Sequence, residues 1–294
     1  MRQGLQKVVW VCVLLLGGAQ LGTARELNIL LANDDGFEAP GLVAVRAALQ
    51  AAGHHVTVVA PRTDQSGSSV KISTAQMAVK EESPGVWVVD GSPADAVWVG
   101  LRRVFKQAPP DLVISGANRG QNLGAVSNLS GTVGAAVMAA MNDVPAIAVS
   151  VGIDFTEAAQ GFPSTLAAYP GAAQFVVGLV ARLSAQPIRK KLLPARTLLN
   201  VNYPAMLPQA IKGARWADLG RGFGYTAAYR EGDAAGTVKL ALGPDTTKYP
   251  SGSRTDTARF AAGFVTLSLL DTSWLAARDA RVDAAARVGD LAKP

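Results

Sequence analysis

From residue 27 onward, short apolar runs alternate with stretches of helical periodicity. The apolar runs have the length of buried strands and are bounded by Gly, Pro or polar residues, which favours strands. The predicted strands are 27–32, 56–60, 86–90, 111–115, 145–151, 198–203 and 263–270, and the predicted helices are 39–53, 92–105, 130–141 and a stretch near 165–185. Strands that alternate with helices are typical of a parallel sheet covered on both faces. The pattern therefore predicts an α/β fold with a mostly parallel sheet.

Two segments interrupt this regular pattern. Pro170 falls inside the last helical stretch, and we expect the helix to start after it because proline disrupts a helix interior. Residues 205–262 are rich in Gly, Ala and Thr and show weak periodicity apart from 237–242. A protruding hairpin or arm fits this composition better than a second core. The sequence therefore predicts one domain over residues 25–294, in which 205–262 form a protruding arm.

Residues 1–24 have the features of a signal peptide. Arg2 and Lys7 precede the apolar run 8–16, and Gly22 and Ala24 fit the small-residue positions of a cleavage site. The run is shorter than the ~20 residues that a membrane-spanning helix needs. An uncleaved membrane anchor is the alternative. We therefore expect an exported, periplasmic protein that is cleaved near Ala24 and has no stable membrane association afterwards.

The charge and the rare residue types narrow the possible chemistry. Beyond residue 24 the chain has 26 Lys and Arg against 22 Asp and Glu, and its basic clusters are short, so a nucleic-acid duplex is not an expected partner. The only cysteine, Cys12, lies in the predicted signal peptide, which excludes a disulfide or a thiol nucleophile from the mature chain.

Histidine is equally scarce. His54 and His55 are the only two and are adjacent in a helix-to-strand link, where we interpret both as solvated loop residues. A Ser-His-Asp triad, a histidine-rich zinc site and a HExxH protease are therefore excluded. Catalysis, if present, must rest on carboxylates together with a metal ion.

Polar side chains gather at the ends of the predicted strands. The strand 27–32 is followed by Asn33, Asp34 and Asp35, 56–60 by the polar stretch 64–69, and 111–115 by 116–122. In open parallel sheets ligands bind beyond the carboxyl ends of the strands. Carboxylate, hydroxyl and carboxamide oxygens are the donors that Mg²⁺, Ca²⁺ and Mn²⁺ prefer. Two adjacent carboxylates otherwise repel each other, so either they form a solvated turn or a cation lies beside them.

The start of the helix 130–141 is a second candidate feature. Ser130 fits a helix N-cap whether or not it binds a ligand. The free N–H groups and positive dipole end of a helix start also suit a phosphate. The chain contains neither G-x-G-x-x-G nor G-x-x-x-x-G-K-[ST]. The individual signals are weak, and their shared position at one sheet edge strengthens them.

Together these motifs resemble the SurE survival-protein family, which comprises metal-dependent phosphatases acting on 5′- and 3′-nucleotides. The matching stretches occur in family order and are 29–42, 58–69, 89–97, 111–124, 130–139, 145–150, 200–204 and 255–270. The resemblance implies a Rossmann-like, doubly wound core with C-terminal elements exchanged between subunits of a homodimer or homotetramer. It also implies a cytoplasmic location, the alternative to export.

The resemblance also implies roles for individual residues. It places one divalent ion per subunit, Mg²⁺ or Mn²⁺, on Asp34, Asp35, Ser66 and Asn118. It lines the phosphate pocket with Asn122, Ser130, Gly131 and Thr132. Asp34, Asp35 and Asn122 are the implied catalytic residues, of which Asp34 is our candidate for orienting or deprotonating the attacking water.

Four other functions compete with a nucleotidase. A haloacid-dehalogenase-type phosphatase needs D-x-D after its first strand, and Gly36 stands where the second acid would be. An exported nucleotide- or phosphate-binding protein without turnover usually has two lobes, whereas this chain predicts one. A broad-specificity acid phosphatase or an exopolyphosphatase remains open, because residues 125–129 lack the acidic and aromatic residues common in the family.

Overall fold

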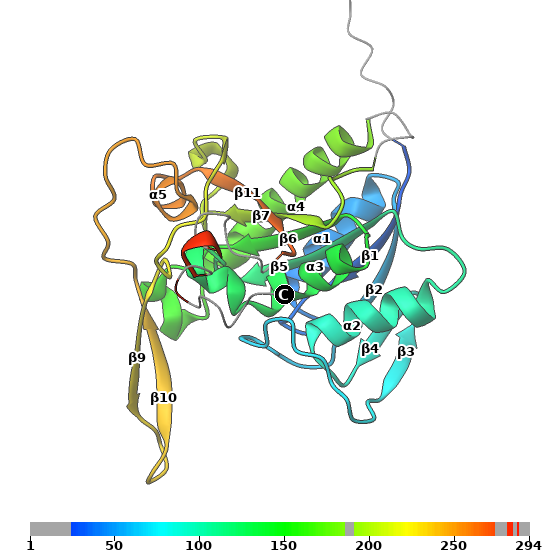
Figure 1. Ribbon diagram of the computed structural model, residues 1–294, viewed down its shortest axis with the longest axis horizontal. Helices are drawn as coiled ribbons and strands as arrows, with labels where there is room; N and C mark the ends of the chain where they lie inside the picture. The colour runs from blue at the N-terminus through cyan, green and yellow to red at the C-terminus, as the bar shows by residue number, and fades with distance from the viewer. Residues whose placement is uncertain (1–24, 186–190, 274–280, 285–286, 288–294) are drawn as a thin grey trace, which may run out of the picture.

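A computed structural model describes residues 25–185, 191–273, 281–284 and 287 (Figure 1). The predicted signal peptide lies outside the described residues. The strands are β1 Asn28–Ala32, β2 His55–Pro61, β3 Val79–Ser83, β4 Val86–Val89, β5 Leu112–Arg119, β6 Ala146–Val151, β7 Thr197–Tyr203, β8 Ala214–Trp216, β9 Thr226–Glu231, β10 Val238–Gly243 and β11 Val265–Asp271. The α-helices are α1 Pro40–Ala51, α2 Pro93–Val99, α3 Gly131–Met141, α4 Pro163–Ser184 and α5 Asp256–Ala261. Short turns are π-helical at Gly100–Val104 and 3₁₀ at Gly124–Asn128, Phe155–Gln160 and Pro208–Ala210.

Nine of these strands form one sheet, in the order β3-β4-β2-β1-β5-β6-β7-β11-β8. The strands from β4 to β7 in this order are all parallel. β3 pairs antiparallel with β4, and β11 pairs antiparallel with β7 and parallel with β8. The chain leaves β1 toward β2 on one side and returns to β5 on the other. The carboxyl ends of β1 and β5 therefore form the switch point at which doubly wound sheets bind ligands. The predicted α/β fold is confirmed.

Helices cover both faces of the sheet (Figure 1). The side chains of β1 alternate: Ile29 and Leu31 pack with α1 and α4, and Leu30 and Ala32 pack with α2 and α3. Because successive strand residues point to opposite faces, a strand covered on both sides must be apolar throughout. All four of these side chains are fully buried.

Helix α4 is longer than the sequence predicts. It begins at Pro163 and continues through Pro170, so the prediction that the helix starts after this proline is wrong. Its length and mean hydropathy of 1.3 would also suit a membrane span. Instead Ala168, Ala172 and Val176 pack one face of α4 into the core beside α1. This tertiary packing outweighs the local cost of the proline.

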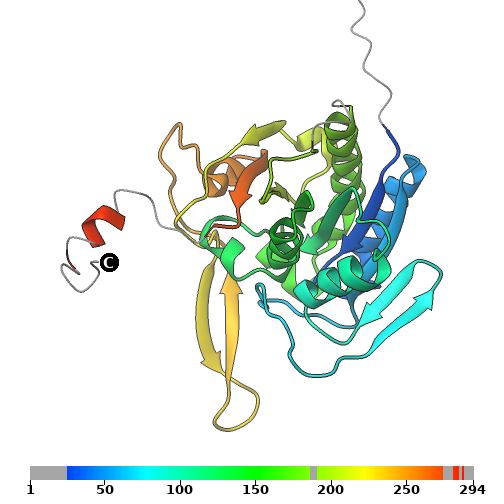
Figure 2. The ribbon, with the colours of Figure 1, turned by 45° about the vertical axis from the view of Figure 1, so that its right-hand side comes forward.

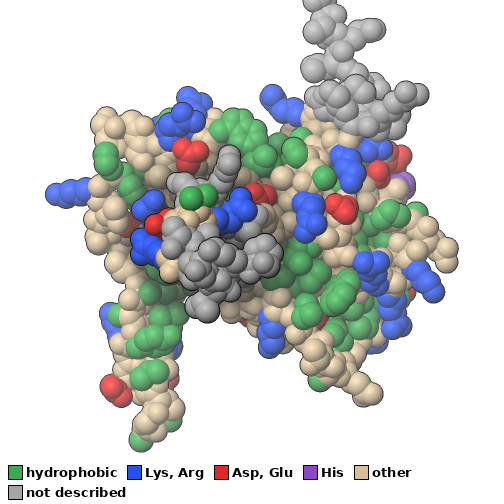
Figure 3. Space-filling view, in the orientation of Figure 1, with side chains coloured by type: hydrophobic (Ala, Val, Ile, Leu, Met, Phe, Trp, Pro, Cys, Tyr) green, Lys and Arg blue, Asp and Glu red, His purple; other side chains and the backbone are tan. Residues whose placement is uncertain are grey.

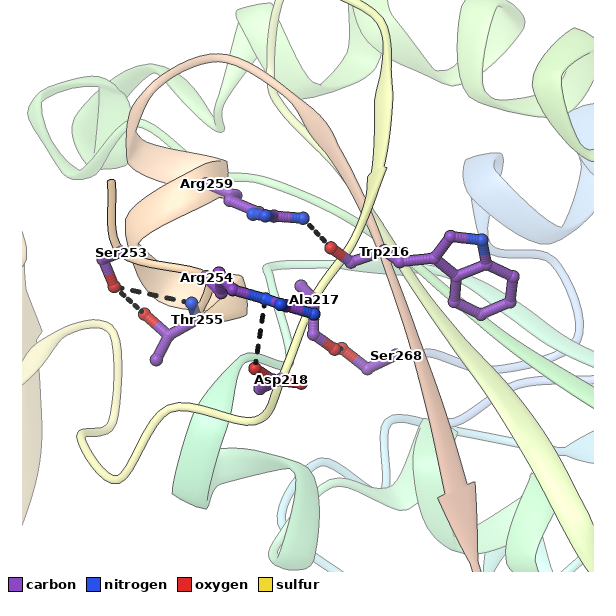
Figure 4. A network of polar contacts seen from close by, with 8 residues as sticks. All are labelled: Trp216, Ala217, Asp218, Ser253, Arg254, Thr255, Arg259 and Ser268. Carbon is purple, nitrogen blue, oxygen red and sulfur yellow. Dashed lines mark hydrogen bonds and ion pairs between the residues drawn. The ribbon is translucent and has the colours of Figure 1, made fainter. Parts of the chain in front are cut away.

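The protruding part is narrower than the predicted 205–262 arm. The hairpin of β9 and β10 projects from the body in two views (Figures 1 and 2), whereas β8 belongs to the main sheet. Polar contacts hold the neighbouring segments to the body (Figure 4). The guanidinium of Arg259 donates to the Trp216 carbonyl, and the Ser268 hydroxyl donates to the Ala217 carbonyl at 2.9 Å. Arg254 forms an ion pair with Asp218 at 3.8 Å.

One buried carboxylate fixes the segment that leads away from β2. Asp95 accepts hydrogen bonds from the Ser73 N–H and hydroxyl, both at 2.8 Å, and from the Ser92 N–H at 2.9 Å. Burial opposes ionisation, but these hydrogen bonds hold the pKa of Asp95 below its usual value. Ser92 in turn caps α2, because its hydroxyl accepts the Asp95 N–H.

We expect Asp95→Ala to lower the free energy of unfolding by about 3 kcal/mol, because it leaves buried donors without an acceptor. Urea denaturation at neutral pH measures the change. Asp154→Ala is the control, since Asp154 makes a similar cap on the exposed turn Phe155–Gln160 and should matter less. Equal losses for the two variants would contradict this interpretation of Asp95.

Candidate metal and phosphate site

The two aspartates that follow β1 face opposite directions. Asp34 Oδ1 accepts a hydrogen bond from the Thr132 hydroxyl at 2.6 Å, so this carboxylate faces the start of α3. Asp35 Oδ2 accepts the Arg119 N–H at 2.9 Å, so this one faces the end of β5. Each carboxylate uses one oxygen in these bonds, and the second oxygen of each remains for a cation.

The loop after β2 lies against the aspartates. The Gln65 N–H donates to the Asp34 carbonyl at 2.8 Å, which places Ser66 next to this turn. Ser66 is exposed, and its own N–H donates to Asp64 Oδ1 at 2.7 Å. Asp64 is close enough to raise the pKa of both Asp34 and Asp35. Sequence reasoning missed Asp64, which lay within a polar stretch that we assigned only through Ser66.

Asn118 reaches the same edge because β5 is irregular. Ser115 pairs with Ala148 and Asn118 with Ser150, so β5 carries one residue more than β6 between these pairs. Such a bulge changes the direction of the following side chains. The Asn118 amide donates to the Gly120 carbonyl at 2.8 Å, which turns the amide oxygen of Asn118 away from that carbonyl.

The start of α3 lies directly against Asp34. A Cβ built on Gly131 would lie 2.9 Å from the Asp34 Cβ and Oδ2 and 2.8 Å from the Ser68 hydroxyl. Only glycine permits this approach, which brings the positive end of the helix dipole beside the carboxylate. The predicted N-cap is confirmed, because the Ser130 hydroxyl accepts the Val133 N–H at 3.1 Å. The buried Ser68 hydroxyl has no partner among the described residues, and sequence reasoning missed it.

Asn122 is held inside the protein. Its amide donates to the Ser150 hydroxyl at 2.8 Å and lies 3.5 Å from the Thr132 hydroxyl. Its N–H donates to Asn202 Oδ1 at 2.7 Å, and the Asn200 amide donates to its carbonyl at 2.9 Å. Asn122 therefore lies close to Thr132, as predicted for the phosphate pocket, but its side-chain amide points toward Ser150 of β6. Sequence reasoning missed Asn200 and Asn202, although polar residues within an apolar strand were a usable signal.

A second buried carboxylate holds the other end of the same loop. Asp256 is fully buried at the start of α5, and its two oxygens accept the N–H groups of Gly124 at 2.7 Å and Gly220 at 2.8 Å. A Cβ on Gly124 would lie 2.2 Å from the Gly222 carbonyl oxygen, so these segments are in close contact. The loop after β5 is therefore fixed at both ends.

The electrostatics of the pair favour a cation. Burial is the main cause that raises the pKa of Asp34 to about 7; the Thr132 hydrogen bond opposes the rise, and the carboxylates of Asp35 and Asp64 add to it. Burial also raises the pKa of Asp35, opposed by Arg119. Among the described residues no cluster of three or more His, Cys, Asp or Glu could hold a metal. A cage here therefore needs the neutral oxygens of Ser66 and Asn118.

The two histidines differ from each other. His54 is buried, and its Nδ1 accepts the Leu27 N–H at 3.3 Å, so the interpretation of this residue as solvated is wrong. Burial lowers its pKa. His55 is exposed and lies 2.8 Å from Glu26. Both sit at the amino end of β2, opposite the edge that carries the aspartates.

Comparisons with known proteins agree with this geometry. A family model described as "Survival protein SurE" matches residues 29–224. A "5′-nucleotidase SurE" from Rhizorhabdus wittichii is 35% identical over 254 residues, which cover 83% of this chain and 93% of that protein. A "5′/3′-nucleotidase SurE" from Photorhabdus laumondii is 34% identical over 246 residues, which cover 83% of this chain and 89% of that protein. The crystal structure of a SurE protein from Aquifex aeolicus matches with a TM-score of 0.73 at 27% identity and covers 90% of this chain and 100% of that one. The chain belongs to the SurE family.

Proposed function

We propose that the protein is a metal-dependent phosphomonoesterase that hydrolyses nucleoside 5′- or 3′-monophosphates to nucleoside and phosphate. Relatives that span most of the chain carry the names of nucleotidases. The observation that carries the proposal is the position of Asp34, a buried carboxylate against the glycine start of α3. This position supports the proposal, because a carboxylate is a strong ligand for a cation and this one lies beside a helix start that suits a phosphate.

The residues at this edge fit one divalent ion, Mg²⁺ or Mn²⁺. Asp34, Asp35, Ser66 and Asn118 would hold it, and all four offer hard oxygen atoms. When bound, such an ion supplies polarisation of the phosphoryl group and a more acidic water.

The chain's own groups then divide the remaining work. Asp34 orients the attacking water and can take its proton. The N–H groups of Gly131 and Thr132 stabilise the phosphoryl oxygens as negative charge spreads over them. Asn122 holds the loop after β5 beside Thr132 through its hydrogen bonds to β6 and β7. Ser130 caps the helix start and leaves its first N–H groups free for the phosphate.

A binding protein without turnover is a weaker fit. A phosphate dianion placed beside Asp34 and Asp35 would be repelled unless a cation neutralised them. A protein that only binds phosphate has no need of paired carboxylates at that position. A broad-specificity acid phosphatase or an exopolyphosphatase would use the same residues and would differ in the group attached to the phosphate.

We also propose that the chain is exported to the periplasm and cleaved near Ala24. The basic start, the short apolar run and the small residues before the cleavage position support this location. The cytoplasm is the alternative.

The projecting hairpin supports assembly into a homodimer or homotetramer. Its side chains Tyr229, Val238 and Leu240 are 73%, 65% and 50% exposed. Apolar side chains follow the hairpin away from the body (Figure 3). Large apolar side chains gathered on one projection are typical of a surface that another subunit covers.

We expect Asp34→Asn to keep the fold and to lower kcat/KM for a nucleoside monophosphate by about 10³-fold, because it removes an ion ligand and the group that orients water. Steady-state kinetics measure the loss, and circular dichroism checks the fold. Asp143→Asn, an exposed change at the end of α3, is the control and should keep full activity. Near-normal turnover by Asp34→Asn would rule out this site.

Metal removal is the second test. Chelation should abolish hydrolysis, and added Mn²⁺ or Mg²⁺ should restore it. Ser66→Ala and Asn118→Ala should each need more metal for half-maximal activity, because each loses one neutral ligand and keeps both carboxylates. Full activity of the wild type in excess chelator would contradict a metal-dependent mechanism.

The metal-free protein should lose stability as pH rises from 3.8 toward about 7 because of Asp34. In this window the folded protein holds a proton that the unfolded chain releases, so the free energy of unfolding falls with rising pH. Urea denaturation of wild type and Asp34→Asn across this window isolates the contribution. The variant should lack it, and added Mn²⁺ should abolish it in the wild type. Identical pH profiles for both proteins without metal would contradict the raised pKa.

A further inference from the structure

A small pocket lies on the Asp35 side of the site. It occupies about 110 Å³ between the start of α1, α4 and the end of β5. Its walls are Asp35, Ala39, Pro40, Arg119, Leu166 and Tyr169. Asp34 faces the start of α3, whereas Asp35 faces this pocket. The two carboxylates therefore separate the phosphate side of the site from the pocket.

Tyr169 brings an unused polar group to the pocket. The residue is 4% exposed, and no described residue forms a hydrogen bond with its hydroxyl. The ring packs against Gly41, where a built Cβ would lie 2.7 Å from the Tyr169 Cε1. Burial and the nearby Asp35 carboxylate raise the pKa of Tyr169, so the phenol is neutral and can donate or accept. The hydroxyl is not among the fully enclosed polar atoms, so it is accessible from the pocket that Tyr169 lines and can bind a ligand there.

The other walls suit an organic group. Leu166 is 46% exposed at the rim, and Ala39 and Pro40 add apolar surface. Arg119 holds Asp35 through its backbone N–H, which leaves its exposed side chain available to a ligand. The pocket thus combines an apolar wall with a hydroxyl, a carboxylate and a guanidinium. That mixture matches a ring that carries several hydroxyl groups.

We infer that this pocket receives the sugar of the leaving nucleoside, with the Tyr169 hydroxyl bound to a sugar hydroxyl. The inference rests on the proposed function and assigns the group attached to the phosphate. A phosphate at the start of α3 would lie on the opposite side of Asp34 and Asp35 from the pocket. The leaving group of an ester that extends past these two carboxylates therefore enters the pocket.

The pocket's size sets a limit on recognition. Its 110 Å³ is far below the ~300 Å³ at which pockets begin to enclose whole drug-sized ligands. One sugar ring can enter, and a sugar together with its base cannot. The base then stays at the rim beside Leu166 and Arg119, where an apolar contact and a flat guanidinium tolerate any base. The site therefore selects the sugar more strongly than the base.

Tyr169→Phe tests the assignment, because it removes one hydroxyl and keeps the ring. We expect kcat/KM for a ribonucleoside monophosphate to fall about tenfold, as one hydrogen bond of ~1.4 kcal/mol implies. Hydrolysis of phenyl phosphate, which has no sugar hydroxyl, should change less than twofold. Tyr203→Phe is the matched control, since Tyr203 is buried under α4 and does not line the pocket. It should leave both substrates unchanged.

A second variant tests the pocket itself. Leu166→Trp should fill the mouth and raise KM for both esters, while inhibition by inorganic phosphate stays unchanged. An equal loss on both substrates with Tyr169→Phe, or no loss on either, would overturn the sugar assignment while the nucleotidase stands. A wild-type protein that hydrolyses neither ester with metal present would instead overturn the proposed function.

Discussion

The site depends on one constraint: a carboxylate, Asp34, is buried where the end of β1 meets the start of α3. Gly131 gives α3 room to approach it, and a Cβ at Gly134 would lie 1.9 Å from the Ser69 carbonyl oxygen. The helix, the aspartate and the loop after β2 therefore fit together only with glycine at both positions. Burial makes the ionised form of Asp34 costly, and the proposed dication between the oxygens at this edge would remove that cost.

Two layers of support hold this arrangement in place. On the α3 side, Asn200 and Asn202 of β7 fix the backbone of Asn122, and Asp256 fixes Gly124. On the α1 side, the Arg119 N–H fixes Asp35 beside the pocket that Tyr169 closes. In the proposed reaction, a phosphate and its leaving group would meet two differently built walls, one of helix N–H groups and hydroxyls and one of apolar and phenolic surface.

The sequence predicts the fold well wherever local pattern and packing agree. The apolar run at β1 and the serine cap of α3 are examples, because both follow from periodicity and capping chemistry. Prediction fails where tertiary contacts override local preference. Pro170 stands inside a helix, and His54 is buried by contact with the residue that precedes β1.

In the site too, the residues set by the local pattern could be predicted and those set by tertiary contacts could not. The oxygen donors at the ends of β1 and β5 could be predicted, because parallel strands place their carboxyl ends together. Asp256 and Tyr169 could not, since only the fold brings Asp256 to Gly124, 132 residues earlier, and Tyr169 to the pocket that it shares with Asp35. Ser68 was hidden within a polar loop, and only the structure shows its hydroxyl buried beside Gly131.

Calorimetric titration of Mn²⁺ into the metal-free protein at pH 7, in buffers of different ionisation enthalpy, tests the central claim most directly. The account predicts one ion per chain and release of part of a proton, because Asp34 with a pKa of about 7 is partly protonated before the metal binds. Asp34→Asn should bind much more weakly and release no proton from this position. Equal affinity and equal proton release in the two proteins would contradict the claim that Asp34 is the buried carboxylate on which the site depends.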